Sequence, residues 1–255
     1  RIAIFAKNQN TETGKVITEK YQTTMNFKEI EIIGFDGDDT LWVNEPLYQD
    51  IEKKLCQLLK DYLPAGQVSA ELFKTEMSNL ELYGYGAKGF MLSQIETAIR
   101  ISKKQIPASV IDQIIDMGKR LLSNPVQLLD GVAEVLKELK QRYKLIVATK
   151  GDLLDQQRKL TQSGLIDHFH HIEIMSDKQA GNYMQLFRNI AVEPQRFLMV
   201  GNSMKSDIQP ILQMGGNAVY VPFHTTWQHE TTDEEPQTGN NYLKVNSISE
   251  ILHFL

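Results

Sequence analysis

Three observations in the sequence predict an α/β protein with a parallel sheet, crossover helices and a helical insert. Short apolar runs rich in β-branched residues alternate with helical patterns over residues 132–222, the order that builds parallel sheets. A further apolar run at residues 29–35 stands alone, well ahead of the others. Helix formers dominate residues 44–124 between them, so we expect a helical insert just after the first strand.

Each expected strand is a short apolar run that ends at a turn or a polar cluster. The first, EIEIIGF, ends at a cluster of Gly and Asp. The later strands are expected at residues 144–149, 171–175, 196–201 and 217–222. Because open α/β sheets bind ligands at the carboxyl ends of their strands, we expect functional residues just after these runs.

The helices follow from apolar residues at helical spacing. Residues 132–143, for example, place Val132, Val135, Leu136 and Leu139 on one face. The other crossover helices are expected at residues 153–163 and 180–190. The helices of the insert are expected at residues 45–62, 71–82, 89–102 and 107–123.

Composition excludes several classes of protein. The 255 residues are 42% hydrophobic and 23% charged, which suits a globular chain with a sizeable core. The single cysteine, Cys56, excludes an internal disulfide and a cysteine-cluster zinc site. The net charge of −5 speaks against a nucleic-acid partner, and no apolar run approaches the roughly 20 residues that a membrane helix needs. We expect a soluble, cytoplasmic protein with a small-molecule partner.

The ends of the predicted domains come from shifts in composition. Residues 1–24 are rich in polar residues without a clear period, which favours a tail or extension ahead of Met25; a short strand at residues 1–7 is the alternative. The core is expected at residues 25–43 and 125–255, and the insert at residues 44–124. Residues 231–241 are expected to form a solvated acidic loop.

The strongest chemical signal is the sequence Asp36-Gly-Asp38-Asp-Thr40 directly after the first strand. In extended backbone, Asp36 and Asp38 would share a face. Two carboxylates about 4 Å apart repel by roughly 4 kcal/mol at an effective dielectric constant of 20. A divalent cation or a shared proton would offset that repulsion, and oxygen ligands of this type suit Mg²⁺. An acidic turn that caps a helix is the alternative.

Three later positions repeat the pattern of polar residues at strand ends. Thr149 is followed by Lys150 and Gly151 at a turn where a hydroxyl and backbone N–H groups could hold a phosphate. Asp152 is expected to cap the next helix. Gly201-Asn202-Ser203, followed by Asp207, ends the fourth strand, and Lys178 soon follows the third.

Taken in order, these motifs resemble those of the haloacid dehalogenase superfamily, in its phosphatase-like branch with a helical cap after the first motif. The resemblance covers residues 29–255. It rests on Asp36-x-Asp38-x-Thr40, Thr149, Lys178, and Gly201-Asn202-Ser203 with Asp207. The resemblance implies a doubly wound, Rossmann-like parallel sheet whose helical cap closes over the site.

The resemblance also implies a Mg²⁺-dependent hydrolase that removes phosphate from a small phosphorylated metabolite. Asp36 would be the nucleophile that forms an aspartyl-phosphate, and Asp38 the general acid and base. Thr149 and Lys178 would stabilise the transferring group. Mg²⁺ would be held by Asp36, the backbone carbonyl of Asp38, Asn202 and Asp207. The expected substrate-binding residues are Thr40, Lys150, Gly151, Tyr85 and Lys88.

Two details depart from that pattern or leave alternatives open. Asn202 stands where the phosphatase pattern most often has Asp, which removes one negative charge from the metal site. Lys150 and Lys159 are rivals to Lys178 for the motif lysine. A metal-free haloacid dehalogenase, a phosphonate hydrolase and a non-catalytic binding protein are the alternative functions; the presence of Asp38 argues against the first.

Two further patterns are expected to be decoys. Gly84-Tyr-Gly86-Ala-Lys-Gly89 matches the dinucleotide-binding GxGxxG, but no strand precedes it. We expect a turn in the cap from which Tyr85 and Lys88 could reach the substrate. His168, His170 and His171 are expected in a surface loop, not in a metal site.

Overall fold

The core is a parallel sheet of six strands in the order β3-β2-β1-β4-β5-β6. The computed structural model describes residues 27, 29–232, 236 and 241–255. The strands are β1 (Ile32–Phe35), β2 (Lys144–Lys150), β3 (His171–Met175), β4 (Phe197–Gly201), β5 (Asn217–Tyr220) and β6 (Tyr242–Lys244). The predicted α/β class is confirmed.

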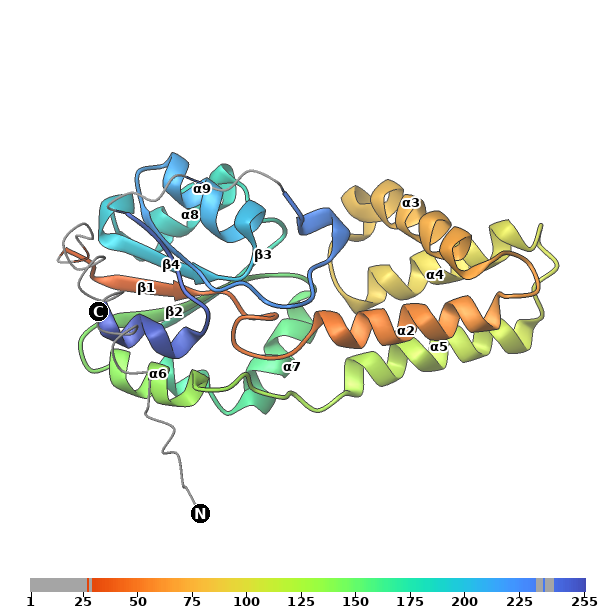
Figure 1. The fold of residues 1–255 in the computed structure, drawn as a ribbon, viewed down its shortest axis with the longest axis horizontal. Coiled ribbons are helices and arrows are strands. Elements are labelled where there is room, and N and C mark those ends of the chain that lie inside the picture. The colour runs from red at the N-terminus through yellow and green to blue at the C-terminus, as the bar shows by residue number, and fades with distance from the viewer. Residues whose placement is uncertain (1–26, 28, 233–235, 237–240) are drawn as a thin grey trace, which may run out of the picture.

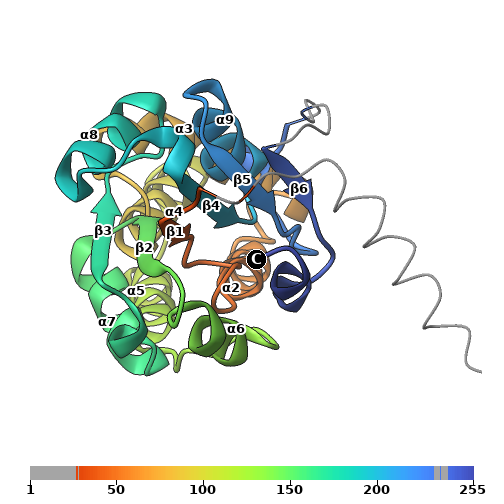
Figure 2. The ribbon, with the colours of Figure 1, turned by 90° about the vertical axis from the view of Figure 1, so that its left-hand side faces the viewer.

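Helices cover both faces of the sheet, as Figure 2 shows. The helices α6 (Val132–Leu139) and α7 (Leu153–Ser163) lie on one face, and α8 (Ala180–Ile190) and α9 (Gln209–Gln213) on the other. Successive strand residues point to opposite faces. Ile33 therefore packs with the α6 side, whereas Ile32 packs with the α8 side. Burial on both faces explains why β1 and β4 are apolar throughout.

Four helices form the insert between β1 and β2, which lies at one end of the long molecule (Figure 1). They are α2 (Glu45–Leu58), α3 (Ala65–Tyr83), α4 (Ala87–Ile101) and α5 (Ala108–Ser123). They enclose a hydrophobic cluster of their own that includes Leu55, Leu72, Phe90 and Ile114. The helical cap is confirmed, and the boundaries at 43/44 and 124/125 stay predictions.

The start of α2 explains one residue of the acidic motif. Asp39 adopts a left-handed backbone with φ 61°, and its carboxylate accepts hydrogen bonds from the N–H groups of Asn44 and Glu45 at 2.8–3.2 Å. These N–H groups have no partner within the helix. Asp39 thus fixes the start of the cap, and the predicted cap role of Asp152 is confirmed by its bond to the N–H of Asp155 at 3.0 Å.

Two elements were missed from the sequence. The strand β6 has three residues and no alternating run, and α9 has five residues between a π-helical turn, Met204–Ile208, and Gly215. Elements this short carry too few periodic positions to be recognised. The predictions for residues 1–24 and for most of the acidic loop lie outside the described residues. No helix in the described part is long and apolar enough to cross a bilayer.

Candidate active site

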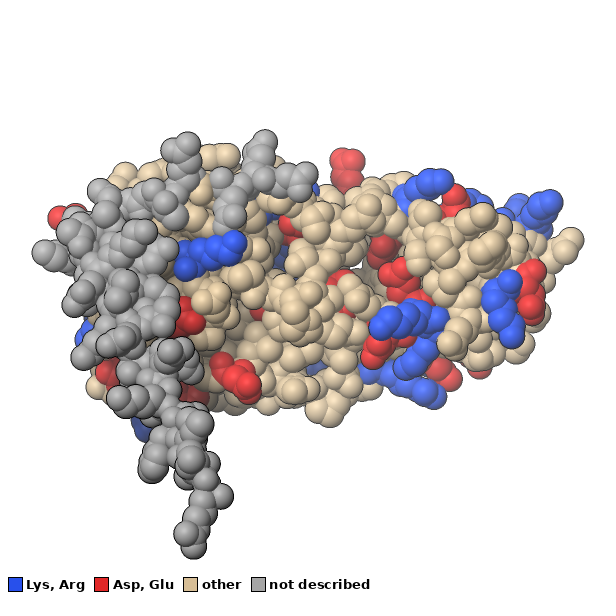
Figure 3. Space-filling model, in the orientation of Figure 1, with Lys and Arg blue, Asp and Glu red and all other residues tan. Residues whose placement is uncertain are grey.

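Nearly all the predicted site residues line one cavity of about 170 Å³ between the strand ends and the cap helices. Figure 3 shows this hollow, with acidic side chains around it. The predicted residues that line it are Asp36, Asp38, Tyr85, Thr149, Lys150, Gly151, Lys178, Asn202 and Asp207. Thr40 and Lys88 are not among the lining residues. Parallel strands bring these segments together because their carboxyl ends meet at one edge of the sheet.

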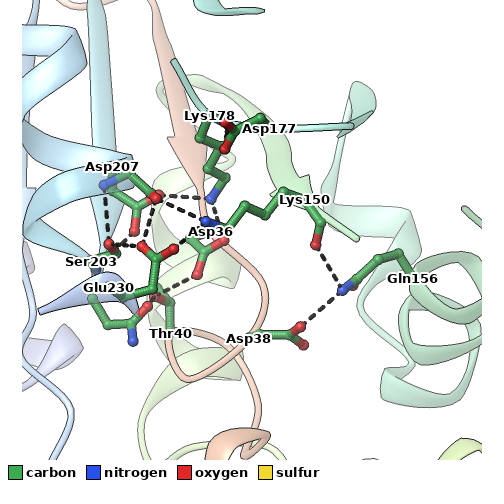
Figure 4. Close-up of polar contacts among 12 residues, drawn as sticks. Asp36, Asp38, Thr40, Lys150, Gln156, Asp177, Lys178, Ser203, Asp207 and Glu230 are labelled. Atoms are coloured by element: carbon green, nitrogen blue, oxygen red, sulfur yellow. Dashed lines mark hydrogen bonds and ion pairs between the residues drawn. The ribbon is translucent and has the colours of Figure 1, made fainter. Parts of the chain in front are cut away.

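Lys178 lies buried between Asp36 and Asp207 (Figure 4). Its Nζ donates to Asp36 Oδ1 and, at 2.7 Å, to Asp207 Oδ1. Burial by itself lowers the pKa of Lys178, but the two carboxylates outweigh it and raise that pKa. Burial raises the pKa of Asp36 to about 7, although Lys178 opposes the rise. One lysine between two carboxylates leaves a net negative charge, which favours a further cation.

The other face of Asp36 meets Asn202. The terminal amide of Asn202 lies 3.1 Å from Asp36 Oδ2 and 3.1 Å from the backbone oxygen of Asp38. With its nitrogen turned toward them, this amide donates to both. With its carbonyl turned toward them, the amide oxygen lies about as far from each of these two oxygens as neighbouring ligands of Mg²⁺ lie from one another, roughly 3 Å for metal–oxygen distances near 2.1 Å. The oxygen set therefore fits Mg²⁺.

Asp207 also has partners within the protein. Its Oδ1 accepts from Lys178, and its Oδ2 accepts from the backbone N–H of Ser203 at 2.9 Å. A Cβ at Gly201 would lie 2.2 Å from Asp207 Oδ2, so only glycine leaves room for this carboxylate. No group of three His, Cys, Asp or Glu side chains in the described residues is arranged to hold a metal. The role of Asp207 as a metal ligand stays a prediction.

The Asp38 side chain points away from Asp36 and has its own partners. Its Oδ1 accepts from Trp42 Nε1 at 2.6 Å and from Lys159 Nζ at 2.9 Å, and its Oδ2 accepts from Gln156 Nε2 at 2.9 Å. The repulsion expected between the two aspartates is therefore offset by a separate lysine for each, Lys178 and Lys159. The hydrogen bonds to Asp38 fix its carboxylate at the cavity wall.

Thr149 is a cavity residue whose hydroxyl the surrounding protein leaves without a partner. Its Oγ1 is buried and accepts or donates no hydrogen bond, and the residue lines the cavity. Buried hydroxyls without partners are uncommon in native proteins, so this one points to a ligand. The N–H of Gly151, in contrast, donates to the carbonyl of Met175 at 3.3 Å. The N–H of Gly151 is therefore not free for a ligand, and what this glycine supplies to the turn is a backbone with a positive φ of 139°.

Lys150 also has a protein partner. It pairs with Glu230 and donates to Ser206 Oγ at 2.9 Å. Burial alone raises the pKa of Glu230, but Lys150 and the hydroxyls of Ser203 and Ser206 lower it to about 2. This cluster joins the turns after β2, β4 and β5, and it keeps the charge of Lys150 balanced within the protein.

The turn between α3 and α4 reaches the core. The hydroxyl of Tyr85 donates to Asp177 Oδ1 at 3.2 Å, and its ring lies 4.1 Å from Lys150 Nζ. Lys88 pairs with Asp152 at 2.8 Å on the rim, outside the cavity lining. Thr40 lies behind Asp36, where its Oγ1 is 3.4 Å from Asp36 Oδ2.

Several cavity residues were missed from the sequence. They are Glu45, Tyr48, Glu52, Glu76, Gln156, Trp227 and Glu230, with Lys159 considered only as a rival lysine; Trp42, a partner of Asp38 outside the lining, was also missed. Glu45, Tyr48 and Glu52 recur on one face of α2, which is a signal that helical periodicity could have supplied. Glu230 carried no such signal, because its partners lie at other strand ends.

The structure also places the glycine pattern and the histidine cluster that were expected to be decoys. The Gly84–Gly89 pattern joins α3 to α4 with no strand before it. His171 pairs with Glu173 at 2.7 Å and is the first residue of β3, so it lies in the strand and not in the loop before it.

Comparisons with known proteins agree with this arrangement. The family model for haloacid dehalogenase-like hydrolases matches residues 30–215. A haloacid dehalogenase-like family hydrolase from Xanthomonas campestris is 36% identical, with a TM-score of 0.78, over 87% of this chain and 88% of that chain. The HAD-hydrolase YfnB of Bacillus subtilis strain 168 is 24% identical over 93% of this chain and 96% of its own.

A third protein shows that the same fold occurs with a different chemistry. A 2-haloacid dehalogenase from Pseudomonas syringae pv. tomato is 18% identical, with a TM-score of 0.58, over 88% of this chain and 96% of that chain. Likeness at this level shows the fold and leaves the reaction open. The family match over most of the sequence and the cavity at the strand ends identify this chain as a member of the haloacid dehalogenase-like hydrolase family.

Proposed function

We propose that this chain is a Mg²⁺-dependent phosphatase of a small phosphorylated metabolite. The observation that carries the proposal is the oxygen set formed by Asp36 Oδ2, the Asp38 backbone oxygen and the Asn202 amide, which lies beside an ionised pair of Asp36 and Lys178. A phosphate monoester carries more negative charge than a 2-haloacid, so attack on it by a carboxylate needs more positive charge nearby. YfnB has been crystallised with bound magnesium, which supports the same assignment here.

In this proposal, Asp36 and Asp38 carry out the chemical steps. Asp36 attacks phosphorus through one carboxylate oxygen, and the bond from phosphorus to the leaving oxygen breaks. Asp38 gives a proton to that oxygen and later takes one from the water that hydrolyses the aspartyl-phosphate. Mg²⁺, when bound, masks charge on the phosphate oxygens.

The remaining tasks are binding and positioning. Lys178 keeps Asp36 oriented and neutralises part of the phosphate charge, while the free hydroxyl of Thr149 donates to a phosphate oxygen. Lys150 and Tyr85 shape the wall of the site through the contacts that they make with Glu230 and Asp177. Lys88 lies at the rim of the cavity, where it pairs with Asp152. Trp42, Gln156 and Lys159 position Asp38.

The experiment is phosphate release from p-nitrophenyl phosphate and a panel of small phosphate esters, with Mg²⁺ and with EDTA. We expect release only with Mg²⁺, and a loss of at least about 10³-fold in Asp36→Asn, because no other group can form the covalent intermediate. Asp167→Asn, an exposed aspartate outside the cavity, is the matched control. Chloride release from 2-chloropropionate in EDTA, without phosphate release from any ester, would identify a dehalogenase instead.

A further inference from the structure

The cavity lining has many more carboxyl groups than positively charged groups. Nine carboxylate residues and three lysines line it. A phosphate group brings about −1.5 to −2 further charges at neutral pH, and one Mg²⁺ ion offsets only two. The cavity is therefore poorly matched to a substrate whose remaining part is neutral or anionic.

The three lysines are already paired inside the protein. Lys178 pairs with Asp36 and Asp207, Lys159 with Asp38, and Lys150 with Glu230. None of them is left to balance the carboxylates on the cap side of the cavity.

Those cap-side carboxylates form a group that we call the carboxylate wall, made of Glu45 and Glu52 on α2 and Glu76 on α3. No ion pair links any of the three to a lysine or arginine in the part of the chain described. Burial and the neighbouring carboxylates raise the pKa of Glu45 and of Glu76 to about 8. The charge of Glu52 adds to the effect of burial on Glu76. By contrast, Glu71, on the same helix but outside the cavity, pairs with Lys74 and Arg100.

Aromatic rings and an unpartnered hydroxyl complete the cavity. The ring centroids of Tyr48 and Phe90 lie 5.0 Å apart, and both residues line the cavity with the carboxylate wall. Rings of this kind attract cations through their faces. The buried Thr149 Oγ1, which has no partner in the protein, lies in the same cavity and points to a ligand there. The cavity thus combines a hydroxyl free for phosphate with a wall suited to positive charge.

We propose that the carboxylate wall binds an ammonium group of the substrate, so that the substrate class is a phosphate monoester that carries an amine. This inference rests on the proposed phosphatase function, since the phosphate end of the cavity sets where the amine must lie. A bound ammonium ion supplies the positive charge that the wall lacks, because an opposite charge within about 4–6 Å favours the ionised carboxylate.

The test compares matched esters that differ only in the terminal group. The aminoalkyl phosphates with two, three and four carbons are paired with hydroxyalkyl phosphates of the same length, and kcat/KM is measured at pH 7.5 with Mg²⁺. We expect the amine to be preferred by at least about tenfold at the best length, which corresponds to about 1.4 kcal/mol. In Glu76→Gln the preference should fall below threefold. Glu81→Gln, which removes an exposed charge from the same helix, should retain it.

Binding provides a second readout that does not depend on turnover. Calorimetry on Asp36→Asn with Mg²⁺ measures the affinity for the same ester pairs. Equal kcat/KM for amine and alcohol, or a preference for the alcohol, overturns the inference while the phosphatase function stands. If no ester is hydrolysed, the phosphatase function fails. Tighter binding of the amine than of the alcohol then still supports the carboxylate wall, and equal binding overturns it.

Discussion

Replacing Lys178 with Met removes the cation that bonds to the buried carboxylates of Asp36 and Asp207. The side chains of Lys178, Asp36 and Asp207 are 2%, 9% and 1% exposed. At the 2.7 Å separation of Lys178 Nζ and Asp207 Oδ1, the attraction is about 6 kcal/mol at an effective dielectric constant of 20. Much of this offsets the cost of burying the ions. The measured loss from breaking a buried pair is typically about 3–5 kcal/mol, and we expect Lys178→Met to lower the free energy of unfolding by that amount.

The loss should depend on pH with a definite sign. Burial already raises the pKa of Asp36 to about 7, and removing Lys178 raises it further. A carboxyl whose folded-state pKa lies above its unfolded value loses stability as pH rises between the two. Below about pH 7 both proteins hold this proton, so the deficit of Lys178→Met should grow as pH rises above about 7 and be larger at pH 8.5 than at pH 6.

The assay is urea unfolding followed by circular dichroism, in EDTA so that no metal compensates for the missing lysine. Lys137→Met on α6, which is exposed, is the control and should change stability by less than about 0.5 kcal/mol. Adding Asp207→Asn to Lys178→Met should recover part of the loss, since it removes one of the two unpaired charges. A single variant within 1 kcal/mol of wild type at pH 7, or a deficit that grows toward pH 5, would refute this reasoning.

Two further predictions concern the acidic groups of the cavity. Because the pKa of Glu76 lies near 8, above its usual 4.5, the folded protein holds a proton that the unfolded chain has released between those pH values. Stability should fall as pH rises through that window, and Glu76→Gln should reduce the slope by up to about 1.4 kcal/mol per pH unit; denaturant midpoints measured from pH 5 to pH 8.5 check this, and an unchanged slope contradicts it. Asn202→Asp adds a charge to the oxygen set, so the Mg²⁺ concentration for half-maximal activity should fall by about tenfold, and an unchanged metal requirement would show that residue 202 does not face the cation.

Local patterns in the sequence determined the fold class and most of the elements. Alternation of apolar runs with helical faces predicted five of the described strands and the crossover helices α6, α7 and α8, because those periodicities come from contacts between near neighbours. The polar residues at the ends of β1, β2 and β4 were found in the same way, since a buried strand can end in carboxylates only where water or a ligand solvates them.

Only the tertiary structure decided how those residues are paired. The contacts from Lys178 to Asp36 and from Lys159 to Asp38 join positions 142 and 121 residues apart, and three lysines in similar local settings acquired different partners. The place of Glu230 beside Lys150 and the gathering of Glu45, Glu52 and Glu76 around one cavity depend likewise on how the cap packs over the sheet. The burial of a side chain and the charges around it depend on elements that are far apart in the sequence. The local sequence therefore does not specify them.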